Sequence, residues 1–472
     1  MKIDFAKPVH VHFIGIGGIS MSGLAEMLKS RGFTVTGSDR DDSEMVEKLR
    51  AAGIEVHCPQ CAENITRYAA DRPVDLVVYT AAIRPDNPEY AAAAEAGIPM
   101  MTRAELLGQI MAQYPVSVAV AGTHGKTTTT AMISGIFLGK GGSPTISVGA
   151  AYPQIGGNYR IGADDTFIAE ACEYTNSFLS LSPFAGVILN IEADHLDFFK
   201  DLADIRASFR RFAAQVSEDG VLVIGADIPD VREITDGIPC RRVITFGLTE
   251  DADVYATDIT HAHRASADAP EGVAFTARFR DGSAPIDIAI PVPGDHNIKN
   301  ALAAIAATHA LGVGAEEIRA SLARFTGASR RFERLGVLNG VTIVDDYAHH
   351  PTEIRATLAA ARSMGYQRIW CAFQPHTYSR TKALLDDFAE ALSGADRVVL
   401  ADIYAAREPD NLGISSLTLR DKIRNLGHSC DYFPSFSEIQ SHLLKNCSDG
   451  DLLIFMGAGE IDKIGYSMLS GT

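Results

Sequence analysis

Predominantly apolar segments recur along the chain and alternate with segments of helical periodicity. Apolar runs without regular polar alternation are typical of strands buried on both faces of a parallel sheet. The clearest runs are residues 9–14, 74–80, 116–121, 167–169, 187–190, 221–224, 341–344, 368–373 and 452–455. Strands separated by helical segments favour parallel sheets covered by helices. We therefore expect an α/β protein.

Two segments depart from this alternation of predicted strands and helices. Within residues 251–291, positions 286–290 alternate between isoleucine and a smaller or polar residue, and no helical pattern intervenes. Period two predicts a small antiparallel patch appended to the middle of the chain. Residues 139–149 are rich in glycine, and we expect them to form a loop.

The composition of the chain argues against some classes of binding partner. Apolar residues make up 46% of the chain, charged residues 21%, and the net charge is −17. Such an acidic protein is a poor ligand for nucleic acid or for an anionic membrane surface. The chain has no long apolar span and no signal-peptide pattern, so we expect a cytoplasmic protein. Seven scattered cysteines fit reduced thiols, and Cys58 and Cys61 lack a second ligand pair for a metal.

Residues 122–130 read Gly-Thr-His-Gly-Lys-Thr-Thr-Thr-Thr and lie between a predicted strand and a predicted helix. This arrangement holds nucleotide phosphates on backbone N–H groups and on a helix N-terminus. Lys126 supplies a full charge, and the hydroxyl of Thr127 can ligate Mg²⁺. The usual spacing would put a glycine at position 120, where the chain has Val120. The segment predicts an ATP-type phosphate loop of shortened spacing.

A second glycine turn, residues 15–23, follows the first predicted strand. Asp39 comes after the next strand, as in a dinucleotide-binding fold, but Ser20 stands where that fingerprint has glycine or alanine. The pattern supports a diphosphate at a helix N-terminus. NAD, another diphosphate-bearing molecule and simple tight packing remain the alternatives.

Acidic residues follow two strands of the middle region. Glu170 and Glu173 come directly after residues 167–169, where either can ligate Mg²⁺ or remain solvated. His195 lies in an acidic segment, residues 191–197, and can serve a second metal, a phosphate or the structure alone.

Further polar residues occur in the last part of the chain. Asn297 and Asn300 lie three apart on a predicted helix, so both can face adenine or phosphates. Arg331, in the connector after residue 326, can swing into a phosphate site. Segments 345–351 and 374–380 each follow a strand, and we expect the two strand ends to be adjacent and to form a crevice site.

Several of these motifs occur together in the order that resembles Mur ligases. They are Gly-Thr-His-Gly-Lys-Thr-Thr, Glu173, Asp194-His195-Leu-Asp197, His296-Asn297-Ile-Lys-Asn300, Ser329-Arg330-Arg331-Phe332 and Asp345-Asp346-Tyr-Ala-His349-His350-Pro351. The resemblance covers essentially the whole chain. Within the family, residues 15–23 and 374–380 most resemble the branch that joins L-alanine to UDP-N-acetylmuramate.

The resemblance implies three domains: a Rossmann-like UDP-sugar domain (1–113), a central P-loop ATPase domain (114–326) and a Rossmann-like amino-acid-binding domain (327–472). It implies an ATP-dependent ligase of peptidoglycan precursor synthesis, with Mg²⁺ or Mn²⁺. ATP would phosphorylate the muramate carboxylate, and the amine of L-alanine would displace phosphate from the acyl phosphate. A monomer and a homodimer are both compatible with it.

The resemblance also implies site residues. Those for ATP are Gly122, Thr123, His124, Gly125, Lys126, Thr127, Thr128, Asn297, Asn300, Arg331 and Asp346. Those for the UDP-sugar are Gly15, Gly17, Gly18, Ser20, Met21, Ser22, Asp39 and Thr80. Those for the amino acid are Tyr347, His349, His376 and Arg380. The metal ligands would be Thr127, Glu173 and His195, and the catalytic residues Lys126, His195 and Arg331.

One departure favours the alanine-adding branch. Several later-acting Mur ligases carry a carbamylated lysine, and the corresponding position here is near Phe209. Two alternatives stay open: a related ligase that attaches a recycled peptide to the same nucleotide sugar, and a non-catalytic nucleotide-binding regulator.

Overall fold

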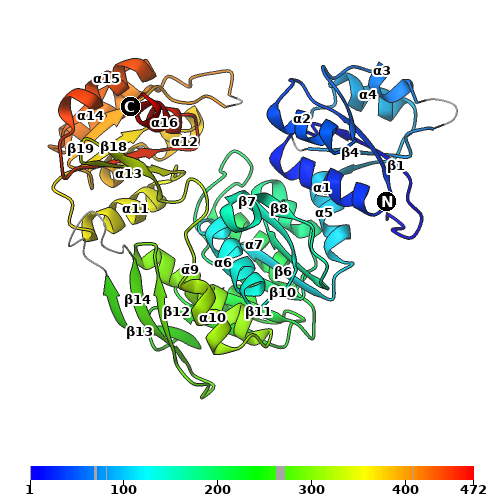
Figure 1. Ribbon diagram of the computed structural model, residues 1–472, viewed down its shortest axis with the longest axis horizontal. Helices are drawn as coiled ribbons and strands as arrows, with labels where there is room; N and C mark the ends of the chain where they lie inside the picture. The colour runs from blue at the N-terminus through cyan, green and yellow to red at the C-terminus, as the bar shows by residue number, and fades with distance from the viewer. Residues whose placement is uncertain (1, 69–71, 81, 262–271, 407, 472) are drawn as a thin grey trace.

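The computed structural model describes residues 2–68, 72–80, 82–261, 272–406 and 408–471. Three sheets of five, ten and six strands follow one another along the chain and are covered by helices. In Figure 1 they form three bodies, coloured blue, cyan to green, and yellow to red. The α/β fold expected from the apolar runs is confirmed. The described residues include no helix long and apolar enough to cross a membrane.

The first sheet is entirely parallel and has the order β3-β2-β1-β4-β5. Its strands are β1 (His10–Ile14), β2 (Thr34–Ser38), β3 (Glu55–His57), β4 (Leu76–Tyr79) and β5 (Met100–Thr102). Its helices are α1 (Ile19–Ser30), α2 (Glu44–Ala51), α3 (Glu63–Thr66), α4 (Pro88–Glu95) and α5 (Arg103–Met111). The helix α1 begins at Ile19, inside the segment 15–23 that was expected to form the glycine turn, so the turn is shorter than the sequence predicts.

The second sheet has the order β15-β14-β13-β12-β11-β10-β6-β9-β7-β8. Its strands are β6 (Val116–Ala121), β7 (Thr145–Tyr152), β8 (Gly157–Arg160), β9 (Thr166–Glu170), β10 (Ala185–Ile188), β11 (Val221–Gly225), β12 (Val243–Gly247), β13 (Val254–His261), β14 (Val273–Phe279) and β15 (Ile286–Ile290). Its helices are α6 (Lys126–Gly139), η1 (Pro153–Ile155), η2 (Tyr174–Ser180), α7 (Leu202–Ala213), α8 (Arg232–Thr235), α9 (Asp295–Ala310) and α10 (Ala315–Leu322).

The antiparallel patch is confirmed as β13–β15, and it continues the parallel sheet because β12 pairs with β13. Residues 262–271 of the predicted patch lie outside the described residues. The prediction of a loop over 139–149 is wrong for residues 145–149, which begin β7 and pair in parallel with β9. β7 also forms an antiparallel hairpin with β8. Val148 and Tyr152 are buried, so apolar contacts stabilise this strand despite its glycine.

The third sheet has the order β16-β17-β21-β18-β19-β20. Its strands are β16 (Glu333–Leu338), β17 (Val341–Asp346), β18 (Ile369–Phe373), β19 (Arg397–Leu400), β20 (Cys430–Tyr432) and β21 (Leu452–Met456). Its helices are α11 (Pro351–Ser363), α12 (Tyr378–Ala383), α13 (Leu385–Leu392), α14 (Ser416–Asn425), α15 (Phe436–Asn446) and α16 (Asp462–Ser470).

The expectation that the strands before segments 345–351 and 374–380 are adjacent is wrong. β21 lies between β17 and β18 and pairs in parallel with both. Both segments nevertheless leave the same carboxyl edge of the sheet, since all three strands run in one direction. The two polar segments therefore still face one side of the third domain.

Candidate functional site

The phosphate loop connects β6 to α6. Gly125 is the N-cap of α6 and has a positive φ of 83°. A Cβ there would lie 2.4 Å from Oδ1 of Asn300, so both the backbone conformation and the space require glycine. Nζ of Lys126 folds back and donates to the carbonyls of Gly122 at 2.6 Å and Thr123 at 3.0 Å. The loop is thus closed around its own lysine.

Acidic side chains surround the start of α6. Oγ1 of Thr127 donates to Glu170 at 2.8 Å, and Nζ of Lys126 lies 2.9 Å from Oε2 of Glu173. That Oε2 is buried, and its ion pair with Lys126 is not accompanied by a hydrogen bond. Nε2 of His195 lies 3.7 Å from the other oxygen of Glu173. Hard oxygen ligands and an oxygen without a hydrogen bond fit Mg²⁺ at this position.

A cavity of about 430 Å³ opens beside the loop. Its walls come from the phosphate loop, from α9 and from the first strand ends of the third domain. Predicted ATP residues that line it are His124, Gly125, Thr128, Asn297, Asn300, Arg331 and Asp346. Asn300 donates to Oδ1 of Asn297 at 3.2 Å, so the two amides lie side by side as the i,i+3 spacing predicts.

Asp346 and Arg331 form the third-domain wall of this cavity. Burial raises the pKa of Asp346 to about 6, although Arg331 and backbone donors lower it. One of these donors is the N–H of Ala348 at 2.7 Å. Nε of Arg331 is buried without a hydrogen-bond partner, and the guanidinium lies 5.2 Å from the ring centre of Tyr347. The arginine keeps donors for an anion in the cavity.

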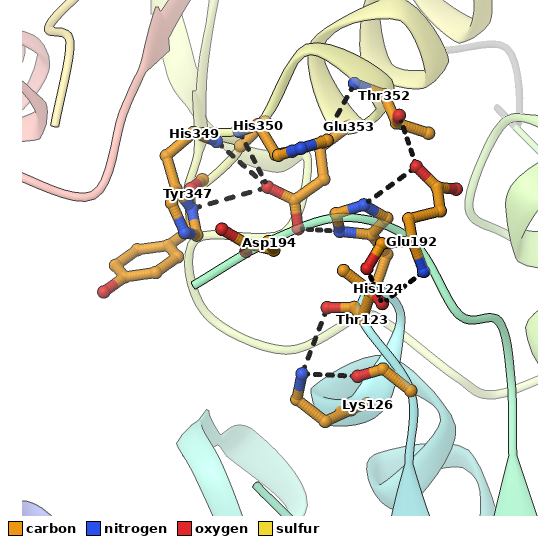
Figure 2. A network of polar contacts seen from close by, with 12 residues as sticks. Thr123, His124, Lys126, Glu192, Asp194, Tyr347, His349, His350, Thr352 and Glu353 are labelled. Atoms are coloured by element: carbon orange, nitrogen blue, oxygen red, sulfur yellow. Dashed lines mark hydrogen bonds and ion pairs between the residues drawn. The ribbon is translucent and has the colours of Figure 1, made fainter. Parts of the chain in front are cut away.

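His124 is held between carboxylates of two domains (Figure 2). Its Nδ1 lies 3.1 Å from Oε1 of Glu353, and its Nε2 lies 3.5 Å from Oε2 of Glu192. Oγ1 of Thr352 donates to Glu192 at 2.6 Å, and the ring of His350 is 4.9 Å from that of His124. The phosphate loop is thereby tied to the first turn of α11.

Sequence reasoning missed both of these carboxylates. Glu353 lies in the first turn of α11, which it caps together with His350. Its second oxygen also accepts from the N–H of His349 at 3.0 Å. Glu192 lies in the acidic segment, residues 191–197, and its place there was the only sequence signal for it. Among the described residues, His124, Glu192 and His350 are the three side chains that lie close enough to one another for a shared metal. However, Nδ1 of His350 already accepts the N–H of Thr352.

A second cavity, of about 440 Å³, lies between the acidic segment after β10 and α12. It is lined by His195, His376 and Arg380. The rings of His349 and His376 are 5.9 Å apart, so the predicted amino-acid residues come together although β21 separates their strands. Burial lowers the pKa of His349 and of His376 to about 4, so both rings are neutral at pH 7.

Arg380 crosses the domain boundary. Its Nε and Nη2 both donate to Oδ1 of Asp194, at 3.2 and 2.9 Å, and Nη1 lies 3.3 Å from Nδ1 of His376. The sequence identified Asp194 only as part of a motif and predicted no role for its side chain. Here it occupies the side of the guanidinium that would bind a carboxylate.

The N-terminal glycine turn forms a separate site. Gly15 has φ 84°, and a Cβ there would lie 2.8 Å from Cγ2 of Thr80. The N–H of Gly17 donates to Asp39 at 2.8 Å. The structure therefore brings these predicted residues together around the turn.

Other predicted residues of this site differ in exposure. Gly18 is exposed, and Ser20 accepts a hydrogen bond from Arg103 at 2.9 Å. Met21 and Ser22 are buried in the first turn of α1, so neither side chain is presented to a ligand. Arg103 was not identified from the sequence.

Family models cover most of the chain. Residues 10–115 match the Mur ligase family catalytic domain, residues 120–308 the Mur ligase middle domain, and residues 330–459 the Mur ligase glutamate ligase domain. Curated relatives span the same length. The UDP-N-acetylmuramate–L-alanine ligase of Agathobacter rectalis is 56% identical over 468 residues, covering 99% of both chains. That of Lachnospira eligens is 54% identical over 469 residues, again covering 99% of both.

Solved structures agree with these matches. UDP-N-acetylmuramate-alanine ligase MurC from Thermotoga maritima superposes with a TM-score of 0.79 at 28% identity, covering 98% of both chains. A murein peptide ligase from Psychrobacter arcticus gives a TM-score of 0.69 at 25% identity, also covering 98% of both. The matches confirm the resemblance seen in the motifs. This chain belongs to the Mur ligase family.

Proposed function

We propose that the protein is an ATP-dependent ligase that joins L-alanine to the carboxylate of UDP-N-acetylmuramate in peptidoglycan precursor synthesis. The observation that carries this proposal is the 56% identity, over 99% of both chains, to a UDP-N-acetylmuramate–L-alanine ligase. The site supports it independently, because the cavity at the phosphate loop and the cavity with Arg380 are both lined by residues of the second and third domains. The murein peptide ligase is more distant, at 25% identity.

ATP would occupy the cavity beside the phosphate loop. Lys126 and the N-terminal N–H groups of α6 would stabilise charge on the transferring phosphoryl group. Thr127 and Glu173 would hold Mg²⁺ or Mn²⁺, and His195 lies close enough to Glu173 to assist. When bound, the ion would neutralise charge on the phosphates. Asn297 and Asn300 would contact the nucleotide, and Asp346 the ribose.

Two steps complete the proposed reaction. The muramate carboxylate oxygen attacks the γ-phosphorus, ADP leaves, and an acyl phosphate forms. The alanine ammonium loses a proton to water, and its neutral nitrogen then attacks the acyl carbon. Phosphate leaves with the bonding electrons and takes up the second proton of the nitrogen, and an amide results. Arg331 would stabilise the phosphoryl oxygens, and Arg380 would bind the alanine carboxylate.

The amino-acid pocket would consist of Tyr347, His349, His376 and Arg380. Neutral histidines suit an incoming amine, because they do not repel its positive charge. Arg380 would exchange Asp194 for the substrate carboxylate, and Asp194 would then be free to face the ammonium group.

We assign the UDP-sugar to residues 1–113, ATP to 114–326 and the amino acid to 327–472. The glycine turn would take the diphosphate at the start of α1. ATP and a UDP-sugar are both metabolites of the cytoplasm, where we expect the enzyme to act.

The test is phosphate release by the purified protein with ATP, UDP-N-acetylmuramate and L-alanine, omitting each substrate in turn. We expect release only when all three are present, together with a product heavier by one alanine residue in mass spectrometry. Replacement of L-alanine by the tripeptide L-alanyl-γ-D-glutamyl-meso-diaminopimelate separates the two ligases. Turnover with the tripeptide and none with alanine would overturn the proposal. Phosphate release that ignores the UDP-sugar would do the same.

A further inference from the structure

Arg103 occupies a junction between the first and second domains. It is the first residue of α5, which the capping box of Thr102 and Glu105 starts directly after β5. Glu105 is engaged there, since its Oε2 accepts from the backbone and the hydroxyl of Thr102 at 2.7 and 2.8 Å. The neighbouring acid of the helix is therefore not a partner for the guanidinium.

Close packing places α5 against η2 of the second domain. Gly108 lies against η2, and a Cβ at this position would lie 1.9 Å from the carbonyl oxygen of Ser180. The absence of a side chain lets the two elements touch. Burial lowers the pKa of Arg103, and Cys172 and Glu170, which lie just after and at the end of β9, act against this lowering.

The guanidinium of Arg103 is poorly satisfied. Its Nη1 donates to Oγ of Ser20 at 2.9 Å. Across the described ranges, no carboxylate oxygen lies within the 4.0 Å of an ion pair to Arg103. Five N–H donors in a fixed fork, with one hydrogen bond between them, match an oxyanion that accepts two bonds at once.

The glycine turn that Arg103 reaches has no cation of its own. Residues 15–23 contain no lysine or arginine, whereas the phosphate loop has Lys126. The N–H of Gly17 is already bonded to the carboxylate of Asp39. A diphosphate at this turn would meet a negative charge and only the partial positive charge of α1. Asn158 of the second domain fixes the turn by donating to the carbonyl of Ile19 at 3.0 Å.

From this geometry we propose that Arg103 is a substrate-binding residue that pairs with the diphosphate of the UDP-sugar at the start of α1. The proposal rests on the proposed function, since that function supplies the nucleotide sugar. Ser20 orients the guanidinium, so the fork faces the turn before the ligand arrives. Arg103 thus supplies the positive charge at the glycine turn, as Lys126 does at the phosphate loop.

The experiment measures binding of UDP, of uridine and of ATP to the wild-type protein and to Arg103→Gln and Arg103→Lys. We expect Arg103→Gln to weaken UDP about 10- to 100-fold, as for a lost charge-assisted hydrogen bond. Arg103→Lys restores part of the affinity, because it keeps the charge without the fork. Uridine and ATP bind all three proteins equally. In turnover, KM for UDP-N-acetylmuramate rises in Arg103→Gln while KM for L-alanine does not.

Arg31→Gln is the matched control. Arg31 belongs to the same domain and has a structural contact instead, donating to the hydroxyl of Tyr114 at 2.9 Å. We expect this variant to bind UDP within about twofold of wild type, a difference of under about 0.5 kcal/mol. Thermal unfolding of each variant separates loss of binding from loss of fold.

Three results would overturn the assignment. The first is wild-type affinity for UDP in Arg103→Gln. The second is an equal loss of ATP and UDP binding, which would mean a structural role at the domain junction. The third is weaker binding of UDP-N-acetylmuramate in Arg103→Gln with unchanged binding of UDP. This result would mean that the guanidinium binds the carboxylate of the sugar and not the diphosphate. Failure of the wild-type protein to bind any uridine diphosphate would instead refute the proposed function.

Discussion

Nδ1 of His124 lies 3.1 Å from Oε1 of Glu353, so one ion pair joins the phosphate loop to the first turn of α11 (Figure 2). Burial alone would lower the pKa of His124, but Glu353 and Glu192 raise it to about 9. Burial, and then the charge of His124, lower the pKa of the nearby His350. The imidazole of His124 is therefore positively charged at neutral pH.

The charge of His124 should make stability depend on pH. A histidine whose pKa is raised by folding contributes stability that is complete below its unfolded pKa of about 6.5. That contribution is lost as the pH rises toward about 9. We expect Glu353→Gln to lower the pKa of His124 and to flatten the fall in Tm between these values. Histidine NMR titration and Tm against pH measure both effects.

Glu316→Gln is a suitable control for this experiment. Glu316 pairs with Arg319 on the exposed face of α10, where an ion pair contributes little. The Glu316→Gln variant should therefore show the same dependence of Tm on pH as the wild-type protein. If Glu353→Gln follows the wild-type curve as closely as the control does, the ion pair to His124 has no energetic consequence.

Removal of the Lys126 charge should impair the chemical step. Electrostatic groups of this kind contribute about 10²- to 10³-fold to kcat. We expect Lys126→Ala to lose activity on this scale and to retain its circular dichroism spectrum. Lys140→Ala, at the other end of α6, is the matched control, since its ammonium packs over Phe137, 4.5 Å from the ring centre. Steady-state kinetics with saturating ATP measure the difference, and wild-type kcat in Lys126→Ala would rule out the proposed role.

Arg380 should determine the affinity for the amino acid. Its fork is held by Asp194 at 2.9 Å and can exchange this partner for the alanine carboxylate. We expect Arg380→Gln to raise KM for L-alanine more than tenfold, about the effect of one charge-assisted bond, and KM for ATP far less. Asp194→Asn frees the guanidinium and should raise KM for L-alanine less than Arg380→Gln does. Equal increases in KM for L-alanine and for ATP in Arg380→Gln would indicate that Arg380 acts on domain closure and not on binding of the amino acid.

Local signals explain which parts of this protein were predictable. The strand β6, the phosphate loop and α6 are encoded within residues 116–139 and occur in the predicted order, although α6 begins at Lys126, inside the segment 122–130 that was expected to form the loop. The order of β17, β21 and β18 is set by packing between distant segments, which no local pattern reveals. The strand β7 was not predicted, because its glycine falls in a glycine-rich segment that was expected to form a loop. The contact between Glu353 and His124 joins two domains, so no local pattern reveals it either.

Gly125 offers a test that separates backbone strain from lost space. Gly125 and Gly141 both have a positive φ, of 83° and 84°. An alanine at either position adopts the left-handed conformation at a cost of about 1–2 kcal/mol. The methyl group at 125 would lie 2.4 Å from Oδ1 of Asn300, whereas nothing lies within 4 Å at 141.

We therefore expect both alanine variants to lose a few degrees of Tm, about 2–4 °C per kcal/mol. Only Gly125→Ala should also weaken ATP binding, because Asn300 must move out of the nucleotide cavity that it lines. Calorimetric titration with a non-hydrolysable ATP analogue measures this affinity in both variants. Equal ATP affinity in the two would show that the contact with Asn300 yields freely, and that the glycine is required for its backbone conformation alone.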